Sequence, residues 1–189
     1  MNSLSGETQN GNLWILTGAR STGKTTLCRR LAAEAQALKW DVAGVISPAV
    51  FDGNGKTGIE VIDLRSGEGR LFARRPLDAN GLPSQEHGWV YDQTALAWGN
   101  AVLEKAVPCD MLVVDELGPL EFEAGRGWVA GLTSVDSRAY RVALVTIRPE
   151  LLPLARQRWP FAGVVDMDAS ESFLEPLDEP SARRAKSVR

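Results

Sequence analysis

The chain has 189 residues, of which 44% are hydrophobic and 24% charged, and its formal net charge is −3 at pH 7. These values are ordinary for one globular domain with a sizeable core, and they exclude the broad basic surface of a non-specific nucleic-acid-binding protein. No apolar run is long enough to cross a bilayer, so we expect no membrane-spanning segment.

Residues 1–11 are polar and contain Asn and Gly, so we expect a disordered N-terminal segment. No basic stretch followed by an apolar one marks a secretory leader. Cys28 and Cys109, the two cysteines, have no metal-ligating neighbours at metal-site spacing and provide no disulfide framework. We therefore expect a cytoplasmic protein in which both cysteines are small core residues.

The first apolar run, residues 13–17, has the length of a buried strand. Residues 18–25 follow and read GARSTGKT, which matches the phosphate-binding (Walker A) pattern G-x-x-x-x-G-K-[ST]. In residues 25–38, apolar side chains recur at helical spacing on one face. The motif thus joins a strand to the N terminus of a helix, where free N–H groups and the helix dipole favour an anion.

Each part of this motif has a chemical reason. Gly18 and Gly23 let the backbone turn tightly and approach a phosphate, and the charge of Lys24 reaches the β- and γ-phosphates. The Thr25 hydroxyl can bind Mg²⁺. We expect the whole loop and the residue after it to bind a nucleotide: Gly18, Ala19, Arg20, Ser21, Thr22, Gly23, Lys24, Thr25 and Thr26.

Short strands at close spacing follow the first helix. Apolar or alternating patterns predict strands at 42–47, 59–64 and 70–73. The glycine-rich stretches between these strands predict turns at 51–58 and 65–69. This spacing is typical of an antiparallel hairpin inserted after the second strand. Lys56 lies in the first of these turns, where it either closes over a nucleotide as part of a lid or is simply solvated.

The rest of the chain alternates helices and buried strands. We expect a loop at 78–88, a helix at 94–106, strands at 111–114, 142–147 and 161–165, and a further helix indicated by Trp128, Leu132 and Val135. This order predicts a three-layer α/β fold of the P-loop NTPase class, with a mainly parallel central sheet and the inserted β-hairpin. The NTPase domain should span residues 12–175, and residues 176–189 should form a flexible basic tail.

Two carboxylates follow the buried strand at 111–114. The carboxyl end of a strand in an open parallel sheet is where ligands bind, so Asp115 and Glu116 should lie near the phosphate loop. There Asp115 would hold Mg²⁺ and Glu116 would orient a water molecule toward the γ-phosphorus. A helix cap or a loop charge is the ordinary role of such a pair, and the upstream phosphate loop favours the metal and water roles.

Several further side chains have more than one reading. Arg20 in the loop and Arg148 after the strand at 142–147 are candidates to stabilise the charge of phosphoryl transfer, or are solvated arginines. His87, the only histidine, lies in a polar loop and is expected to be solvated. Trp89 and Tyr91 could stack a nucleobase, whereas Trp98 is expected in the core.

Residues 115–121, DELGPLE, resemble the D-E-[IL]-G-P-[ML]-E signature of the THEP1-type nucleoside-triphosphatases. The segment GVISP at 44–48, the Ser-Gly-Glu turn at 66–68 and the Cys-Asp step at 109–110 are also similar, and the likeness covers residues 13–165. The chain departs from the family at three places. It has Lys56 where an Arg is usual, Thr-Ile-Arg at 146–148 where Thr-x-His is frequent, and no clear Asn-Arg-Asp counterpart at 168–172.

The resemblance implies a phosphate-loop enzyme that hydrolyses nucleoside triphosphates, ATP and GTP among them, to diphosphates with Mg²⁺. It also implies that Glu116 acts on water. Lys24, which with the loop amides binds the phosphates, is the second candidate catalytic residue. Two alternatives remain open. A nucleoside or nucleotide kinase would need an acceptor pocket and an Arg-rich lid, and the predicted hairpin is poor in Arg. A nucleotide-gated switch would instead present the basic tail or the hairpin to a protein partner.

Overall fold

The structure, a computed structural model, describes residues 11–53, 55–76, 78 and 88–169. The predictions made for residues 1–10, for His87 and for the basic tail lie outside this part of the chain. Among the described residues, no helix combines the length and the apolar character that a membrane crossing requires.

One mixed sheet of nine strands forms the centre of the molecule, in the order β6-β5-β4-β2-β7-β8-β1-β9, with β3 paired to β4. Its parallel part is built from nearly continuous apolar runs that are mostly buried, as the sequence predicts, except for the half-buried edge strand at 163–166. These strands are β1 (Asn12–Thr17), β2 (Val42–Ile46), β7 (Cys109–Leu117), β8 (Tyr140–Ile147) and β9 (Gly163–Asp166). Because they run in one direction, the loops after them gather at one edge of the sheet.

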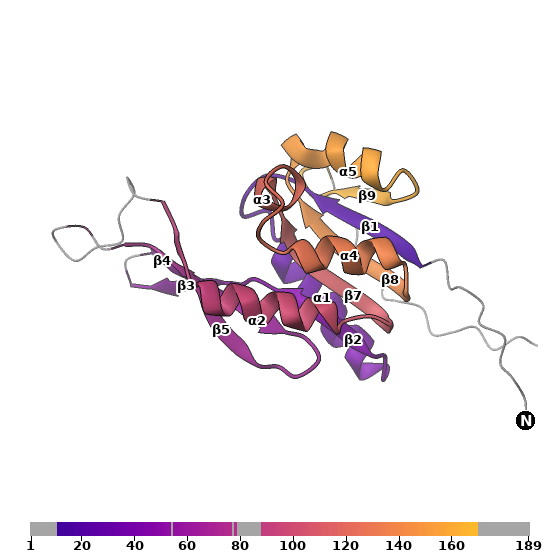
Figure 1. Cartoon of the computed structure of the whole chain (residues 1–189), viewed down its shortest axis with the longest axis horizontal. Coiled ribbons are helices and arrows are strands. Elements are labelled where there is room, and N and C mark those ends of the chain that lie inside the picture. Colours follow the sequence, from indigo (N-terminus) through magenta and orange to yellow (C-terminus); the bar gives the residue numbers. More distant parts are fainter. Residues whose placement is uncertain (1–10, 54, 77, 79–87, 170–189) are drawn as a thin grey trace, which may run out of the picture.

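The antiparallel part is larger than the predicted hairpin. It consists of β3 (Ala49–Asp52), β4 (Gly55–Asp63), β5 (Gly69–Arg74) and β6 (Val90–Tyr91). We call these four strands the extension, and Figure 1 shows them projecting to the left of the body.

The turn predicted at 51–58 is present but shorter than expected, because residues 51–52 belong to β3 and residues 55–58 to β4. The glycines misled the prediction. A Cβ at Gly58 would lie 3.0 Å from Leu71 and 3.2 Å from the Ala73 carbonyl oxygen. Gly58 therefore allows close strand packing and does not mark a turn.

Helices cover both faces of the sheet, which confirms the three-layer arrangement. From α1 (Lys24–Ala37), Cys28, Ala32 and Ala35 pack into the core on one face. On the other face lies a larger core to which α2 (Gln93–Glu104), α4 (Val129–Ser137) and α5 (Leu152–Arg158) contribute. The sequence did not predict α5, nor the short α3 (Pro119–Phe122) and the 3-10 turn Pro149–Leu151.

The two cysteines behave as apolar residues. Cys28 is fully buried, and burial raises the pKa of its thiol well above the ordinary value. Cys109 is partly buried, and burial raises its pKa to about 12. Both side chains are therefore protonated thiols at neutral pH, as the sequence suggested for core cysteines.

A glycine in β2 brings two strands unusually close beside the site. Gly44 has a φ of 102°, and a Cβ added there would lie 2.0 Å from the Val113 carbonyl oxygen in β7. Only glycine tolerates both the conformation and the close approach. As a result Ser47, just after β2, lies within hydrogen-bonding distance of Asp115 in β7.

Candidate active site

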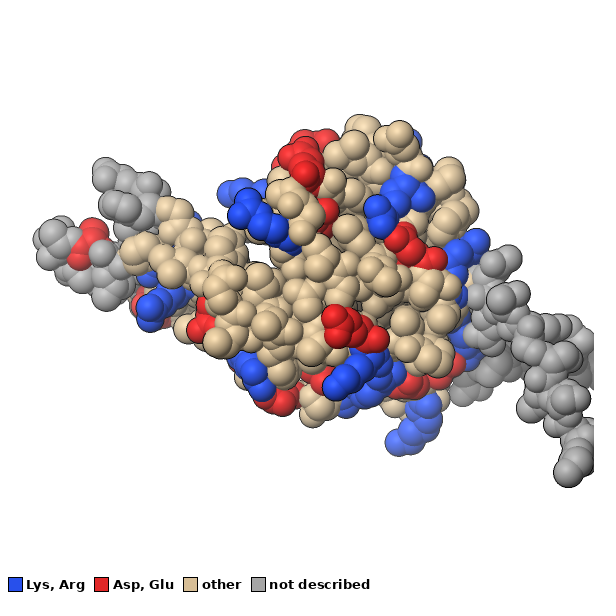
Figure 2. Space-filling model, in the orientation of Figure 1, with Lys and Arg blue, Asp and Glu red and all other residues tan. Residues whose placement is uncertain are grey.

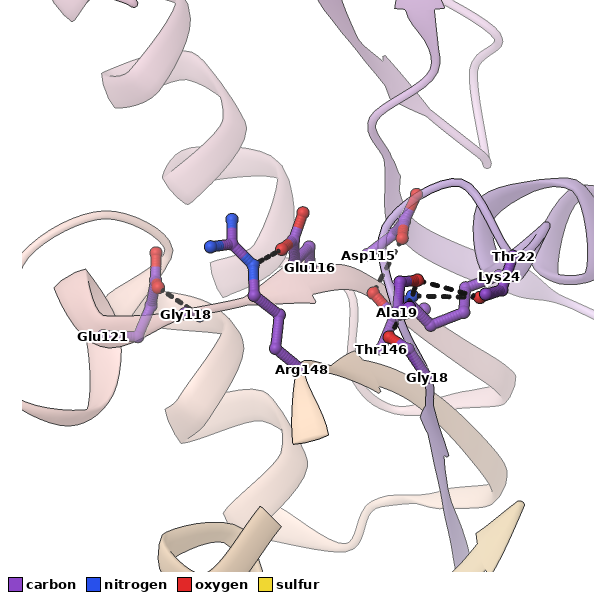
Figure 3. Close-up of polar contacts among 10 residues, drawn as sticks. All are labelled: Gly18, Ala19, Thr22, Lys24, Asp115, Glu116, Gly118, Glu121, Thr146 and Arg148. Atoms are coloured by element: carbon purple, nitrogen blue, oxygen red, sulfur yellow. Dashed lines mark hydrogen bonds and ion pairs between the residues drawn. The ribbon is translucent and has the colours of Figure 1, made fainter. Parts of the chain in front are cut away.

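The phosphate loop lies between β1 and α1 and has the conformation that its glycines permit. Gly18 and Gly23 have φ values of 142° and 90°. The Lys24 Nζ folds back across the loop and donates hydrogen bonds to the carbonyl oxygens of Gly18, at 2.7 Å, and Ala19, at 2.6 Å (Figure 3). Because Gly23 precedes α1 and has no side chain to cap it, the first N–H groups of the helix are available to an anion.

Asp115 lies at the carboxyl end of the parallel sheet and meets this loop. It is 2% exposed, and its Oδ2 accepts a hydrogen bond from the Ser47 amide at 3.1 Å. Its Oδ1 accepts one from the Thr146 hydroxyl at 2.8 Å. The Thr25 hydroxyl lies near enough to Asp115 to lower the pKa of that carboxylate. Burial raises the pKa of Asp115, and the Ser47 amide and the Thr146 and Thr25 hydroxyls act in the opposite direction.

The contact between Thr25 and Asp115 fits a magnesium site. A hydroxyl and a carboxylate are hard oxygen ligands, and Mg²⁺ usually takes one or two protein ligands and completes its shell with water and phosphate oxygens. Within the described residues, no group of three or more His, Cys, Asp or Glu side chains is arranged to hold a metal ion. Thr25 and Asp115 would supply two protein ligands, and phosphate oxygens and water would complete the shell.

Glu116 is directed differently from its neighbour. Its side chain is 42% exposed, and its Oε1 accepts a short hydrogen bond from the Nε of Arg148 in an ion pair. From the sequence, Glu116 and Arg148 were assigned separate roles. The structure shows that they form an ion pair beside Asp115 (Figure 3). Arg148 thus fixes one oxygen of the Glu116 carboxylate. Arg20, the other candidate arginine, is exposed on the phosphate loop.

Glu121 holds the loop that follows this carboxylate pair. It is buried, and its two oxygens accept hydrogen bonds from the backbone amides of Gly118 and Trp128, each at 2.7 Å. Burial raises the pKa of Glu121, and the two amide hydrogen bonds act against that change. The sequence analysis noted Glu121 only as the last residue of the segment 115–121. Nothing in the local pattern shows which backbone amides donate hydrogen bonds to its carboxylate.

Asp168, which follows β9, holds the phosphate loop from the opposite side. Its Oδ2 accepts a hydrogen bond from the Ala19 amide at 2.8 Å, and the neighbouring Met167 amide donates to the Thr17 carbonyl oxygen at 2.8 Å. The sequence assigned no role to Asp168. The available signal was its position after the last parallel strand, at the edge where the other site residues lie.

The aromatic candidates lie on or beside the extension. Trp89 has the Lys56 Nζ at 5.2 Å and the Arg75 Cζ at 5.0 Å from its ring centroid. Tyr91 is exposed and packs against Phe72, with ring centroids 5.2 Å apart. For Trp89 and Tyr91 a base-stacking role stays a prediction. Trp98 is partly buried and packs against the core, close to expectation.

Comparison with known proteins gives a consistent result. The model of a family described as NTPase matches residues 14–146. The nucleoside-triphosphatase THEP1 of Pyrobaculum islandicum is 31% identical over 142 residues, which are 75% of this chain and 77% of that protein.

Two solved structures share the fold. The solution structure of a human cancer-related nucleoside triphosphatase has a TM-score of 0.62 and 22% identity, over 82% of this chain and 88% of that one. The crystal structure of THEP1 from Aquifex aeolicus has a TM-score of 0.56 and 18% identity, over 82% of this chain and 87% of that one.

Proposed function

This chain belongs to the THEP1-type nucleoside-triphosphatase family, and on that premise we propose that it hydrolyses nucleoside triphosphates to diphosphate and phosphate with Mg²⁺. The observation that carries the proposal is the contact of Thr25, at the end of the phosphate loop, with the buried carboxylate of Asp115. These two elements are the halves of a phosphate-loop active site.

The phosphate loop binds the substrate in this proposal. Lys24 and the amides at the start of α1 hold the β- and γ-phosphates, and Lys24 leaves the Gly18 and Ala19 carbonyl oxygens to do so. Thr25 and Asp115 would hold Mg²⁺, which when bound neutralises charge on the phosphate oxygens. Ser47 and Thr146 keep the Asp115 carboxylate oriented by donating hydrogen bonds to it.

Glu116 acts on the attacking water. Its carboxylate accepts a hydrogen bond from the water and directs the oxygen at the γ-phosphorus, while Arg148 prevents the carboxylate from rotating away. The bond from the γ-phosphorus to the bridging oxygen breaks as the water oxygen adds. The products are a nucleoside diphosphate, inorganic phosphate and one proton, which Glu116 passes to solvent.

A phosphate-release panel tests this function. The protein is incubated with ATP, GTP, CTP or UTP, with Mg²⁺ or with a chelator, and without any acceptor. We expect release from several of the triphosphates, reduced by about 100-fold or more when Mg²⁺ is removed. Release that requires an added nucleoside or nucleotide acceptor would indicate a kinase instead. Tight binding with negligible release would indicate a nucleotide-gated switch.

A further inference from the structure

Three side chains of the extension gather at one end of it. Lys56 belongs to β4, Arg75 follows β5 and Trp89 precedes β6. The strands bring them together, because the Arg75 amide donates to the Thr57 carbonyl oxygen at 2.9 Å and β5 pairs with β6. Both cations lie over the Trp89 ring, at 5.2 Å for Lys56 Nζ and 5.0 Å for Arg75 Cζ. The indole thus restricts where both charges point.

This end of the extension faces the catalytic carboxylate. The charge on Lys56 interacts with those of Glu116 in β7, Arg20 in the phosphate loop and Arg148 after β8, as well as with Arg75. Tyr91 of β6 in turn lies close enough to Arg148 to influence the pKa of that guanidinium. Figure 2 shows an opening between the extension and the body, with Lys or Arg side chains at its rim.

Positive charge gathers at this end of the extension, and an anion bound there would be stabilised by it. The charge of Lys56 interacts with those of Arg75, Arg20, Arg148 and Glu116, and Glu116 is already paired with Arg148. Partial desolvation of this exposed side chain and the three arginines lower the pKa of Lys56 below its ordinary value of 10.5, although Glu116 acts in the other direction. A terminal phosphate group bound beside Glu116 would offset the mutual repulsion of these cations.

We propose that Lys56 is a further catalytic residue, whose ammonium contacts the terminal phosphate of a bound triphosphate and stabilises the charge that builds up in the transition state. Arg75 and Trp89 are positioning residues that hold Lys56 toward Glu116. This inference rests on the proposed function. Lys24 is engaged with the loop and Arg148 with Glu116, whereas Lys56 is exposed and approaches from the other side of the site.

The first test replaces Lys56 with methionine, which keeps the length of the side chain and removes its charge. We expect kcat to fall by about 10- to 100-fold, with KM changed by less than about threefold, because the contact strengthens in the transition state. Lys105→Met is the matched control, since Lys105 is an exposed lysine at the end of α2, and it should keep the wild-type kcat.

The second test does not depend on turnover. ADP with aluminium fluoride and Mg²⁺ mimics the transferring phosphoryl group. Lys56→Met should bind this complex about tenfold or more weakly than wild type, and ADP alone within about twofold. If wild type releases no phosphate while Lys56→Met still loses affinity for the fluoride complex, hydrolysis is wrong, but the contact of Lys56 with the transferring phosphoryl group stands. If Lys56→Met keeps both its kcat and its affinity for the complex, or if wild type binds neither ligand, the inference is overturned.

A pH profile separates the charge of Lys56 from its packing. As pH rises, kcat/KM of the wild type should fall as Lys56 loses its proton, at a pH below that expected for an ordinary lysine, because partial desolvation and the nearby arginines lower the pKa of Lys56 and this parameter reports the free enzyme. Lys56→Arg should restore kcat and move the fall to higher pH, since a guanidinium stays charged and so do the three arginines that face it. Trp89→Leu should reduce kcat and shift the same limb of the profile, while Trp89→Phe should do neither. Identical profiles for wild type and Lys56→Arg would contradict the role of the ammonium.

Discussion

Replacement of Lys24 with alanine is expected to weaken the binding of a nucleoside triphosphate by about 100-fold, or roughly 2.7 kcal/mol. The Lys24 ammonium lies across the phosphate loop, 2.7 Å from the Gly18 carbonyl oxygen, and no other lysine occupies the motif at 18–25. Without it the loop amides remain, but the charge that binds the β- and γ-phosphates is lost. Isothermal titration with a non-hydrolysable triphosphate measures the change.

Two controls interpret the Lys24 variant. Because Lys24 also hydrogen-bonds the Gly18 and Ala19 carbonyl oxygens, thermal unfolding must show that the domain remains folded. Lys105→Ala, away from the loop, should bind the triphosphate like wild type. An unchanged triphosphate affinity in a folded Lys24→Ala protein would contradict the proposal that the phosphate loop binds the nucleotide.

Glu116→Gln is expected to lower kcat by about 100- to 10,000-fold and to leave the triphosphate affinity within about threefold of wild type. Glutamine has the same size, and its amide oxygen can still accept the hydrogen bond from Arg148. It cannot take a proton from water, so the chemical step is lost while the binding site persists. Single-turnover phosphate release and titration with a non-hydrolysable triphosphate measure the two quantities separately.

Glu123→Gln is the matched control for this variant, because Glu123 is an exposed carboxylate beyond α3 and should not affect turnover. A loss of affinity as large as the loss of kcat would mean that Glu116 holds the loop or the nucleotide in place. An unchanged kcat would mean that a group other than Glu116 orients and deprotonates the attacking water.

The sequence was sufficient for the parts of the fold that depend on local pattern. The apolar runs of β1, β2, β7 and β8 predict buried parallel strands because each is bounded by turn or helix signals. The phosphate loop was equally clear, since its glycines, Lys24 and Thr25 act together over eight adjacent residues. The carboxyl ends of parallel strands lie at one edge of a sheet, so the position of Asp115 near this loop also followed.

The remaining features depend on contacts between distant segments. Strand β6 has only two residues, which is too short for a periodic pattern in the sequence. It is defined by its pairing with β5. Asp168 bonds the Ala19 amide across a separation of 149 residues. The pairing of Glu116 with Arg148 is likewise decided by the side-by-side packing of β7 and β8. Sequence reasoning identified both residues of this pair but not their contact.

The phosphate loop and the tip of β7 form one magnesium–triphosphate site in this account, and one binding measurement tests that claim most directly. A non-hydrolysable triphosphate is titrated into wild type and into Asp115→Asn, each with and without Mg²⁺. Since Asp115 contacts Thr25 from the buried side of the site, Mg²⁺ should strengthen wild-type binding by about tenfold or more. The same addition should change the affinity of Asp115→Asn by less than about twofold. An equal gain from Mg²⁺ in both proteins would contradict the account.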